Sequence, residues 1–258
     1  MRNWTMAFVP LALAMTTAGC NGSVTGSRDG AAGNGEGKVE RTAAAGPQVT
    51  KTYALTGFTG VELAGPDDIT IRRGDAFSIT AKGPQAEIDL LEVELDGTTL
   101  SVGRKREGLS FGNRDDDGVE IIITMPRLDK LRLTGSGEIE ADTADGDAVE
   151  AVVTGSGDLK VAKLTAKTVK IAVSGSGDIE IGGGTAGTGD YSVTGSGNID
   201  ADALAAETLD ISITGSGDVE ANASGTADVN ILGSGDVEIR GGATCSTRAM
   251  GSGTATCK

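Results

Sequence analysis

The chain has 258 residues, of which 41 are glycine and only 3% are aromatic, and its formal net charge at pH 7 is −15. From Gly135 onward, 19 Asp and Glu face 7 Lys and Arg, so −12 of that charge lies there and −3 in the rest. Acidity on this scale disfavours nucleic acid as a partner. Because the chain contains no histidine, Ser-His-Asp and Cys-His nucleophilic sites and histidine metal sites are excluded.

The first 19 residues have the pattern of a lipoprotein signal peptide. Arg2 precedes an apolar stretch from Met6 to Met15, and small residues lead to Cys20. The sequence Ala-Gly-Cys at this junction resembles the bacterial lipobox, in which the cysteine becomes the acylated first residue of the mature protein. We therefore expect Cys20 to carry a lipid anchor that attaches the chain to the membrane. Asn21 after it indicates the outer membrane, facing the periplasm or the exterior.

Residues 20–48 are rich in Gly, Ala and Ser and contain almost no large apolar side chains. Such a composition predicts a disordered tether rather than a packed element. A flexible chain of this length would hold the folded part roughly 30 Å from the anchor.

Residues 49–134 alternate apolar and polar side chains, which predicts strands separated by turns. The Asp96-Gly97 dipeptide and residues 65–68 are turn signals, and only residues 85–91 favour a helical turn or two. Charged runs at 104–106 and 115–117 flank the surroundings of Phe111, and we interpret them as a solvated loop. The strands are expected at residues 61–63, 69–71, 77–80, 93–95, 99–102, 119–123 and 131–133.

Residues 135–258 are organised by a Gly-Ser-Gly motif that recurs every 20 residues and, near the end, every 18. It begins at Gly135, Gly155, Gly175, Gly195, Gly215, Gly233 and Gly251. Units this short cannot bury a core alone and are stabilised by stacking on their neighbours. The period predicts an all-β fold, a right-handed parallel β-helix with coils of about 18–20 residues. Residues 49–258 would form one domain, with irregular coils over 49–134 and regular ones over 135–258.

Most Gly-Ser-Gly motifs are followed by a residue with a side-chain oxygen. The acidic members are Glu138, Asp158, Asp178, Asp218 and Asp236, whereas Asn198 and Thr254 lack the charge. One interpretation is a ladder that binds cations such as Ca²⁺ weakly, and the other is an acceptor for a turn amide. The uncharged members favour the turn role, but carboxylates stacked about 4.8 Å apart repel one another and should attract cations. We assign no other cofactor, no specific metal site and no catalytic residue.

The remaining cysteines, Cys245 and Cys257, form an even pair in an exported chain. Aligned on the repeat, they fall at inward-facing positions, equivalent to Ala227 and Ile239. We predict a disulfide that closes the last coil.

Residues Gly57 to Val61, residues Val119 to Leu128 and the serial Gly-Ser-Gly-Asp units resemble the bacterial putative auto-transporter adhesin head GIN domain family. The resemblance covers about 49–258 and implies a parallel β-helix with a role in adhesion. It carries no catalytic residues. We therefore expect a non-enzymatic envelope lipoprotein that presents an acidic β-helix to an envelope or surface protein or a glycan. The alternative is a β-helix protein that binds or degrades polysaccharide.

Overall fold

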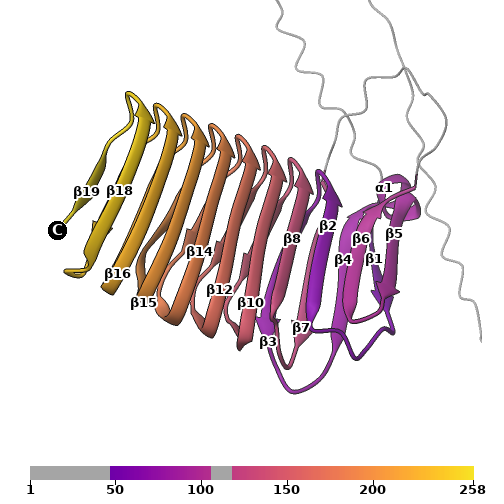
Figure 1. Cartoon of the computed structure of the whole chain (residues 1–258). Helices are drawn as coiled ribbons and strands as arrows, with labels where there is room; N and C mark the ends of the chain where they lie inside the picture. Colours follow the sequence, from indigo (N-terminus) through magenta and orange to yellow (C-terminus); the bar gives the residue numbers. More distant parts are fainter. Residues whose placement is uncertain (1–46, 106–117) are drawn as a thin grey trace, which may run out of the picture. The chain divides into compact units, whose positions relative to one another are not determined.

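The computed structural model describes residues 47–105 and 118–258 (Figure 1). The signal peptide, Cys20, nearly all of the tether and the surroundings of Phe111 lie outside these residues. Within the described part, the single helix is far too short to cross a bilayer.

The described chain consists of strands apart from that helix. Its first part contains β1 (Gln48–Tyr53), β2 (Gly60–Gly65), β3 (Asp68–Arg73), β4 (Ser78–Pro84), α1 (Gln85–Leu90), β5 (Leu91–Asp96), β6 (Thr99–Arg104) and β7 (Glu120–Met125). Its second part contains β8 (Lys130–Gly135), β9 (Glu138–Ala141), β10 (Ala144–Gly155), β11 (Asp158–Val161), β12 (Leu164–Gly175), β13 (Ile179–Ile181), β14 (Gly184–Gly195), β15 (Ile199–Gly215), β16 (Val219–Gly233), β17 (Val237–Arg240), β18 (Thr244–Gly251) and β19 (Ala255–Cys257). The strands and the helix expected between residues 61 and 133 are present within a residue or two. Strand β1 was not predicted, and it begins at Gln48, the last residue assigned to the tether.

The regular coils stack in parallel, with each residue above its equivalent one repeat earlier. Val153 pairs in register with Val173, and Val173 with Val193, so the offset is the 20-residue period of the sequence. The offset falls to 18 between β15 and β16, where the ladder shifts register near Ala205. These pairings confirm the parallel β-helix, whose coils follow one another along a single axis (Figure 1).

The core is a column of branched aliphatic side chains that point inward at alternate positions. Val153, Val173, Val193, Ile213 and Ile231 form one such row, and each is at most 3% exposed. Parallel strands with covered inner faces favour β-branched residues, which explains why the inward positions repeat as Val and Ile.

The turn that follows each long strand depends on glycine. Gly175 has a φ of +129°, which side-chain-bearing residues rarely adopt. A Cβ at Gly177 would lie 2.1 Å from the carbonyl oxygen of Gly157 in the preceding coil. Each turn therefore touches the turn below it through backbone alone.

The first coils stack in an order that differs from their order in the sequence. Strands β8 and β9 pair with β2 and β3, whose other edges pair with β6 and β7. The coil containing β6 and β7 thus lies outside the coil that precedes it in the chain. Strands β1, β4 and β5 add antiparallel pairs, and with α1 they close this end of the stack (Figure 1). The sequence did not predict this closing cap.

A buried ion-pair cluster lies in this cap. The Asp67 carboxylate is fully buried; its Oδ1 and Oδ2 lie 2.6 and 3.0 Å from Arg104 nitrogens, and Oδ1 also accepts the Val119 N–H at 3.0 Å. Arg104 also contacts Glu87 of α1, which is itself buried. The interpretation of Arg104 as part of a solvated run was therefore wrong, because Asp67 and Glu87 hold it against the core. Residues 115–117 lie outside the described residues.

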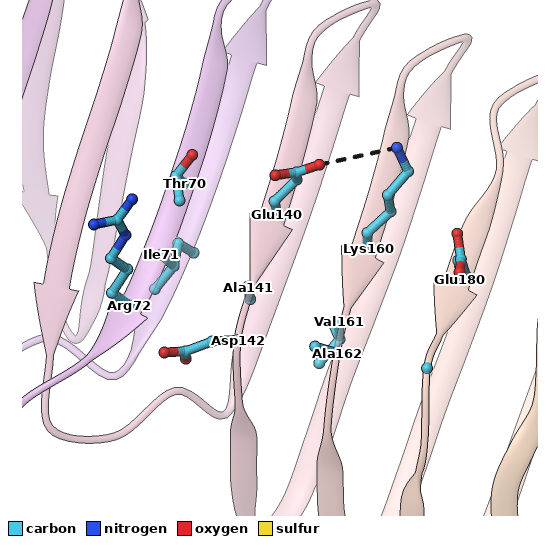
Figure 2. A pocket seen from close by; sticks show the side chains of 11 residues that line it. Thr70, Ile71, Arg72, Glu140, Ala141, Asp142, Lys160, Val161, Ala162 and Glu180 are labelled. Atoms are coloured by element: carbon cyan, nitrogen blue, oxygen red, sulfur yellow. Dashed lines mark ion pairs between the residues drawn. The ribbon is translucent and has the colours of Figure 1, made fainter.

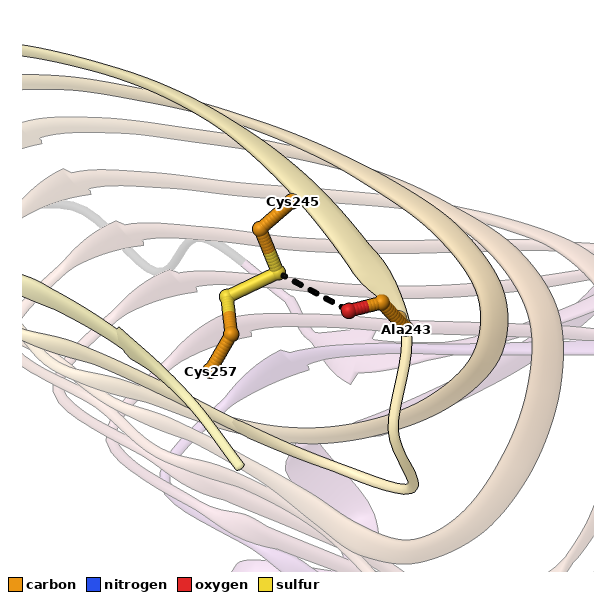
Figure 3. Close-up of a disulfide and its surroundings, with 3 residues drawn as sticks. All are labelled: Ala243, Cys245 and Cys257. Atoms are coloured by element: carbon orange, nitrogen blue, oxygen red, sulfur yellow. Dashed lines mark hydrogen bonds between the residues drawn. A yellow bond between two sulfur atoms is a disulfide. The ribbon is translucent and has the colours of Figure 1, made fainter.

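The last coil is closed by the disulfide between Cys245 on β18 and Cys257 on β19 (Figure 3). The two cysteines stack on Ala227 and Ile239, the inward positions expected from the repeat. Between them, Thr247 and Ala249 replace the aliphatic Val229 and Ile231 of the coil below. The apolar column thus ends in small or polar side chains with a covalent bridge across them.

Replacing both cysteines by serine is expected to loosen the last coil. The bridge spans a sequence separation of 12, so its loss should lower the free energy of unfolding by on the order of 3 kcal/mol. Urea unfolding and hydrogen exchange of β18 and β19 would measure this, and reduction of the wild type should reproduce it. Unchanged exchange in both strands would contradict the closing role.

Candidate functional site

The short strands of successive coils present a surface that we call the acidic face. It comprises two outward rows, because alternate residues of a strand point to the same side and each coil repeats the one before. The first row is Asp68, Glu138, Asp158, Asp178, Asn198, Asp218 and Asp236, and the second is Glu140, Lys160, Glu180, Asp200, Glu220 and Glu238. The sequence analysis identified the acids of the first row from Glu138 onward, but not the second row.

Side chains of the first row bind the backbone of the next coil. Asp178 Oδ1 accepts the N–H of Asn198 at 2.8 Å, and Asn198 Oδ1 accepts the N–H of Asp218 at 3.0 Å. The same bond joins Asp218 to Asp236 at 2.7 Å. These contacts agree with the amide-acceptor interpretation, except that the donor belongs to the following coil. They also explain why Asn can replace Asp here, since only one oxygen is required.

The last acid of this row, Asp236, has the most favourable donors. Both the hydroxyl and the N–H of Thr254 donate to Asp236 Oδ1, at 2.7 and 2.8 Å. These bonds, the hydroxyl first, lower the pKa of Asp236 below its ordinary value. A lowered pKa in the folded state adds stability above the unfolded-state pKa, and this stability is lost as the pH falls through the folded-state pKa.

Replacing Thr254 by valine should therefore raise the pKa of Asp236 towards its ordinary value. Valine removes the hydroxyl donor and keeps the branched shape. The carboxyl ¹³C shift of Asp236, followed by NMR from neutral to acidic pH, would measure the change. Asp158, several coils away, should titrate identically in both proteins. An unchanged Asp236 titration would show that the hydroxyl bond has no effect.

The second row contains cations that bridge its carboxylates. Lys160 Nζ lies 2.5 Å from Glu138 and 4.0 Å from Glu140. The pKa of Lys160 is raised, mainly by its bond to Glu138. At the other end, the Arg240 guanidinium lies 3.0 Å from Glu238 and 3.3 Å from Glu220. The charge of the face is thus lowered at both ends, and the acids between them lack such partners.

Three of these acids come close enough together to hold a metal ion. Carboxylate oxygens of Asp200, Asp202 and Glu220 lie within 4.8 Å of one another. Arg240 contacts both Asp202 and Glu220, so a protein cation already faces the group. The sequence analysis missed this cluster, because Asp202 belongs to neither acidic row.

A groove of about 630 Å³ lies at the end of the acidic face near β3 (Figure 2). It follows a third outward position, where Asp142 is succeeded by Ala162 and Gly182 in the next coils. The small residues leave a hollow whose walls carry charge of both signs. These walls include Arg72, Glu140, Lys160 and Glu180. The missed signal was the fall in side-chain size from Asp142 to Gly182 at one repeat position.

A family model described as "Putative auto-transporter adhesin, head GIN domain" matches residues 57–243. No curated protein matches the chain. Several solved structures do, all below 25% identity, and they therefore support the fold alone.

A putative adhesin from Bacteroides fragilis is 22% identical, with a TM-score of 0.71 over 82% of this chain and 97% of that one. A putative adhesin from Parabacteroides merdae is 20% identical, with a TM-score of 0.64 over 83% and 97%. A putative lipid binding protein from Parabacteroides distasonis is 23% identical, with a TM-score of 0.64 over 83% and 97%.

Proposed function

Because the chain belongs to the putative auto-transporter adhesin head GIN domain family, we propose that it is an exported, non-enzymatic binding module that acts in adhesion or in organising the cell envelope. Its ligand would be an envelope or surface protein or a glycan, held along the acidic face. The family description names adhesion, and the face offers carboxylates at regular spacing on a rigid support.

The observation that carries this proposal is the register of the acidic face. Glu180, Asp200 and Glu220 stack on consecutive coils, about 4.8 Å apart. Because their backbone is held by ladder pairing on both sides, these groups lose little further freedom on binding. A repetitive ligand with cationic groups, or an anionic glycan bridged by Ca²⁺, would meet an equivalent contact at every coil. The groove beside Arg72 would hold one end of such a ligand.

A glycan array probed with and without Ca²⁺, together with a product assay on acidic polysaccharides, tests this function. We expect binding without turnover. The double variant Glu180→Gln/Asp200→Asn should weaken binding about fivefold or more, since both contacts lie at the centre of the face. Asp190→Asn/Asp210→Asn removes the same charge from the outward side of the long strands β14 and β15 and should have little effect. Release of products, or equal losses in both variants, would contradict the proposal.

We also propose that Cys20 anchors the protein to the outer membrane through lipid, with residues 20–48 as the tether. The proposal rests on the signal-like leader and the Ala-Gly-Cys junction. Mass spectrometry of protein extracted from membranes should find Cys20 acylated at the mature N-terminus. Cys20→Ser should shift the protein to the soluble fraction. An unmodified Cys20, or cleavage elsewhere, would contradict the anchor.

A further inference from the structure

The last coil has an open sheet edge. In the interior coils, inward residues of the short strands donate their N–H to the next coil, as Val219 does to Asp236 at 3.0 Å and Val237 to Thr254 at 2.8 Å. Ala255 is the next residue in this series, and no described strand lies beyond it. On β18, the inward residues Cys245, Thr247 and Ala249 have the same orientation. Their N–H and C=O groups face outward from the end of the stack, as on any unpaired edge strand.

The acidic rows all stop before this edge. On the long strands, the row Asp190, Asp210 and Asp228 ends in Ser246. On the short strands, Asp236 is followed by Thr254 and Glu238 by Thr256. Between residues 241 and 258 there is no acid at all, although every earlier regular coil contains several. The edge is therefore freed of the charge that would repel an acidic strand.

The outward side of β18 has cationic and apolar side chains in place of the missing acids. Arg248 is exposed and forms no ion pair with the described residues. Met250 is 65% exposed and stacks on Leu232, which is 54% exposed. They continue a row that consists of hydroxyl residues in the earlier coils, such as Thr194 and Thr214.

A charge on an edge strand can also protect it from unwanted pairing. A protective edge would not place two exposed apolar side chains beside the free backbone, because these increase association. The opposite end of the stack is closed by β1, β4, β5 and α1, so the two ends are built differently (Figure 1).

We propose that the edge of β18 is a docking site for an extended, acidic segment of a partner polypeptide, which adds a strand to the sheet. The segment would bond to the outward N–H and C=O groups of Cys245, Thr247 and Ala249. On its outward side it would carry an acid beside Arg248 and, two residues away, an apolar side chain beside Met250. This interaction is separate from ligand binding on the acidic face and does not depend on it.

Binding of a labelled peptide to the full chain tests the proposal. The probe is a fluorescein-labelled octapeptide that alternates threonine with glutamate and valine, and the control peptide has lysine in place of glutamate. Fluorescence anisotropy should show saturable binding of the acidic peptide only. Hydrogen exchange should show that the amides of Thr247 and Ala249 become protected, while exchange in β4 is unchanged.

Two variants and a matched control locate the site. Arg248→Glu should weaken binding about tenfold or more by reversing the charge. Thr247→Pro should also weaken it, because it removes one outward donor and leaves the bonds to β16 intact. Lys170→Glu makes the same charge change at an exposed position on β12 and should leave binding within about twofold. Unchanged thermal unfolding of each variant confirms that it has folded.

Several outcomes would overturn the proposal. These are the absence of saturable binding up to about 1 mM peptide, equal binding of the lysine peptide, or equal losses for Arg248→Glu and Lys170→Glu. A concentration-dependent dimer with β18 protected in the absence of peptide would show instead that a second copy occupies the edge.

Discussion

Replacing Arg104 by alanine should lower the free energy of unfolding by about 3–5 kcal/mol, the cost of breaking a buried ion pair by removing one partner. The Asp67 carboxylate is fully buried, and Arg104 contacts both of its oxygens. The same guanidinium neutralises Glu87 of α1. Its bond to Asp67 raises the pKa of Arg104, so the cation is present at every pH at which the fold is studied. Without it, two buried carboxylates would lose their counter-charge.

Urea unfolding of the full chain would measure this loss. The matched control is Arg72→Ala, which removes an exposed arginine that forms no ion pair with the described residues, and it should change stability by about 0.5 kcal/mol or less. Adding Asp67→Asn to Arg104→Ala should recover part of the loss, since the amide is neutral. If Arg104→Ala proved as mild as the control, the cluster would not hold the cap.

Gly177→Ala should destabilise the protein by about 3 kcal/mol or more, at the upper end of the range for overpacked sites. The new Cβ would lie 2.1 Å from the carbonyl oxygen of Gly157 and 2.9 Å from Cγ1 of Val153. Neither contact can be relieved by rotating a flexible side chain, because one atom is backbone and the other is a buried branched residue. The coil would have to move away from its neighbour, which lengthens the ladder hydrogen bonds nearby.

Ser176→Ala, one residue earlier, is the control for this substitution. Ser176 lies at the outward tip of the same turn, so the loss of its hydroxyl should cost about 0.5 kcal/mol or less. Thermal unfolding of the two variants would separate a steric effect from a general sensitivity of the turn. Equal stability would show that the stack has more space at its corners than the structure indicates.

The regular coils were predictable from the sequence because a single offset determines many contacts. Once Val173 is placed above Val153, the same step places each turn above its predecessor and the cysteines at the inward positions. The same argument predicted a closing disulfide and a row of oxygen acceptors. Parallel pairing in register converts a repeated residue directly into a row in space.

The cap could not be predicted by this argument, because β6 and β7 carry no Gly-Ser-Gly motif. Which strand edge they pair with depends on contacts that are distant in the sequence. Asp67 shows the difficulty, since its neighbours Pro66 and Asp68 indicate an exposed turn. Its burial depends on Arg104, which lies 37 residues later.

The candidate site was predicted in part. The first acidic row is visible because each member follows a recognisable motif, as Asp178 follows Gly175-Ser176-Gly177. The groove requires a comparison of side-chain volumes at a single repeat position, where Ala162 and Gly182 follow Asp142. The Asp200, Asp202 and Glu220 cluster combines neighbouring rows, so no single row indicates it.

The constant 20-residue register between β8 and β15 makes the coil an interchangeable unit of inheritance. A duplication or deletion of twenty codons that begins and ends at equivalent serines would preserve every contact between neighbours. The rod would change in length by about 4.8 Å for each such event. Evolution could therefore adjust how far this protein reaches without redesigning either of its ends.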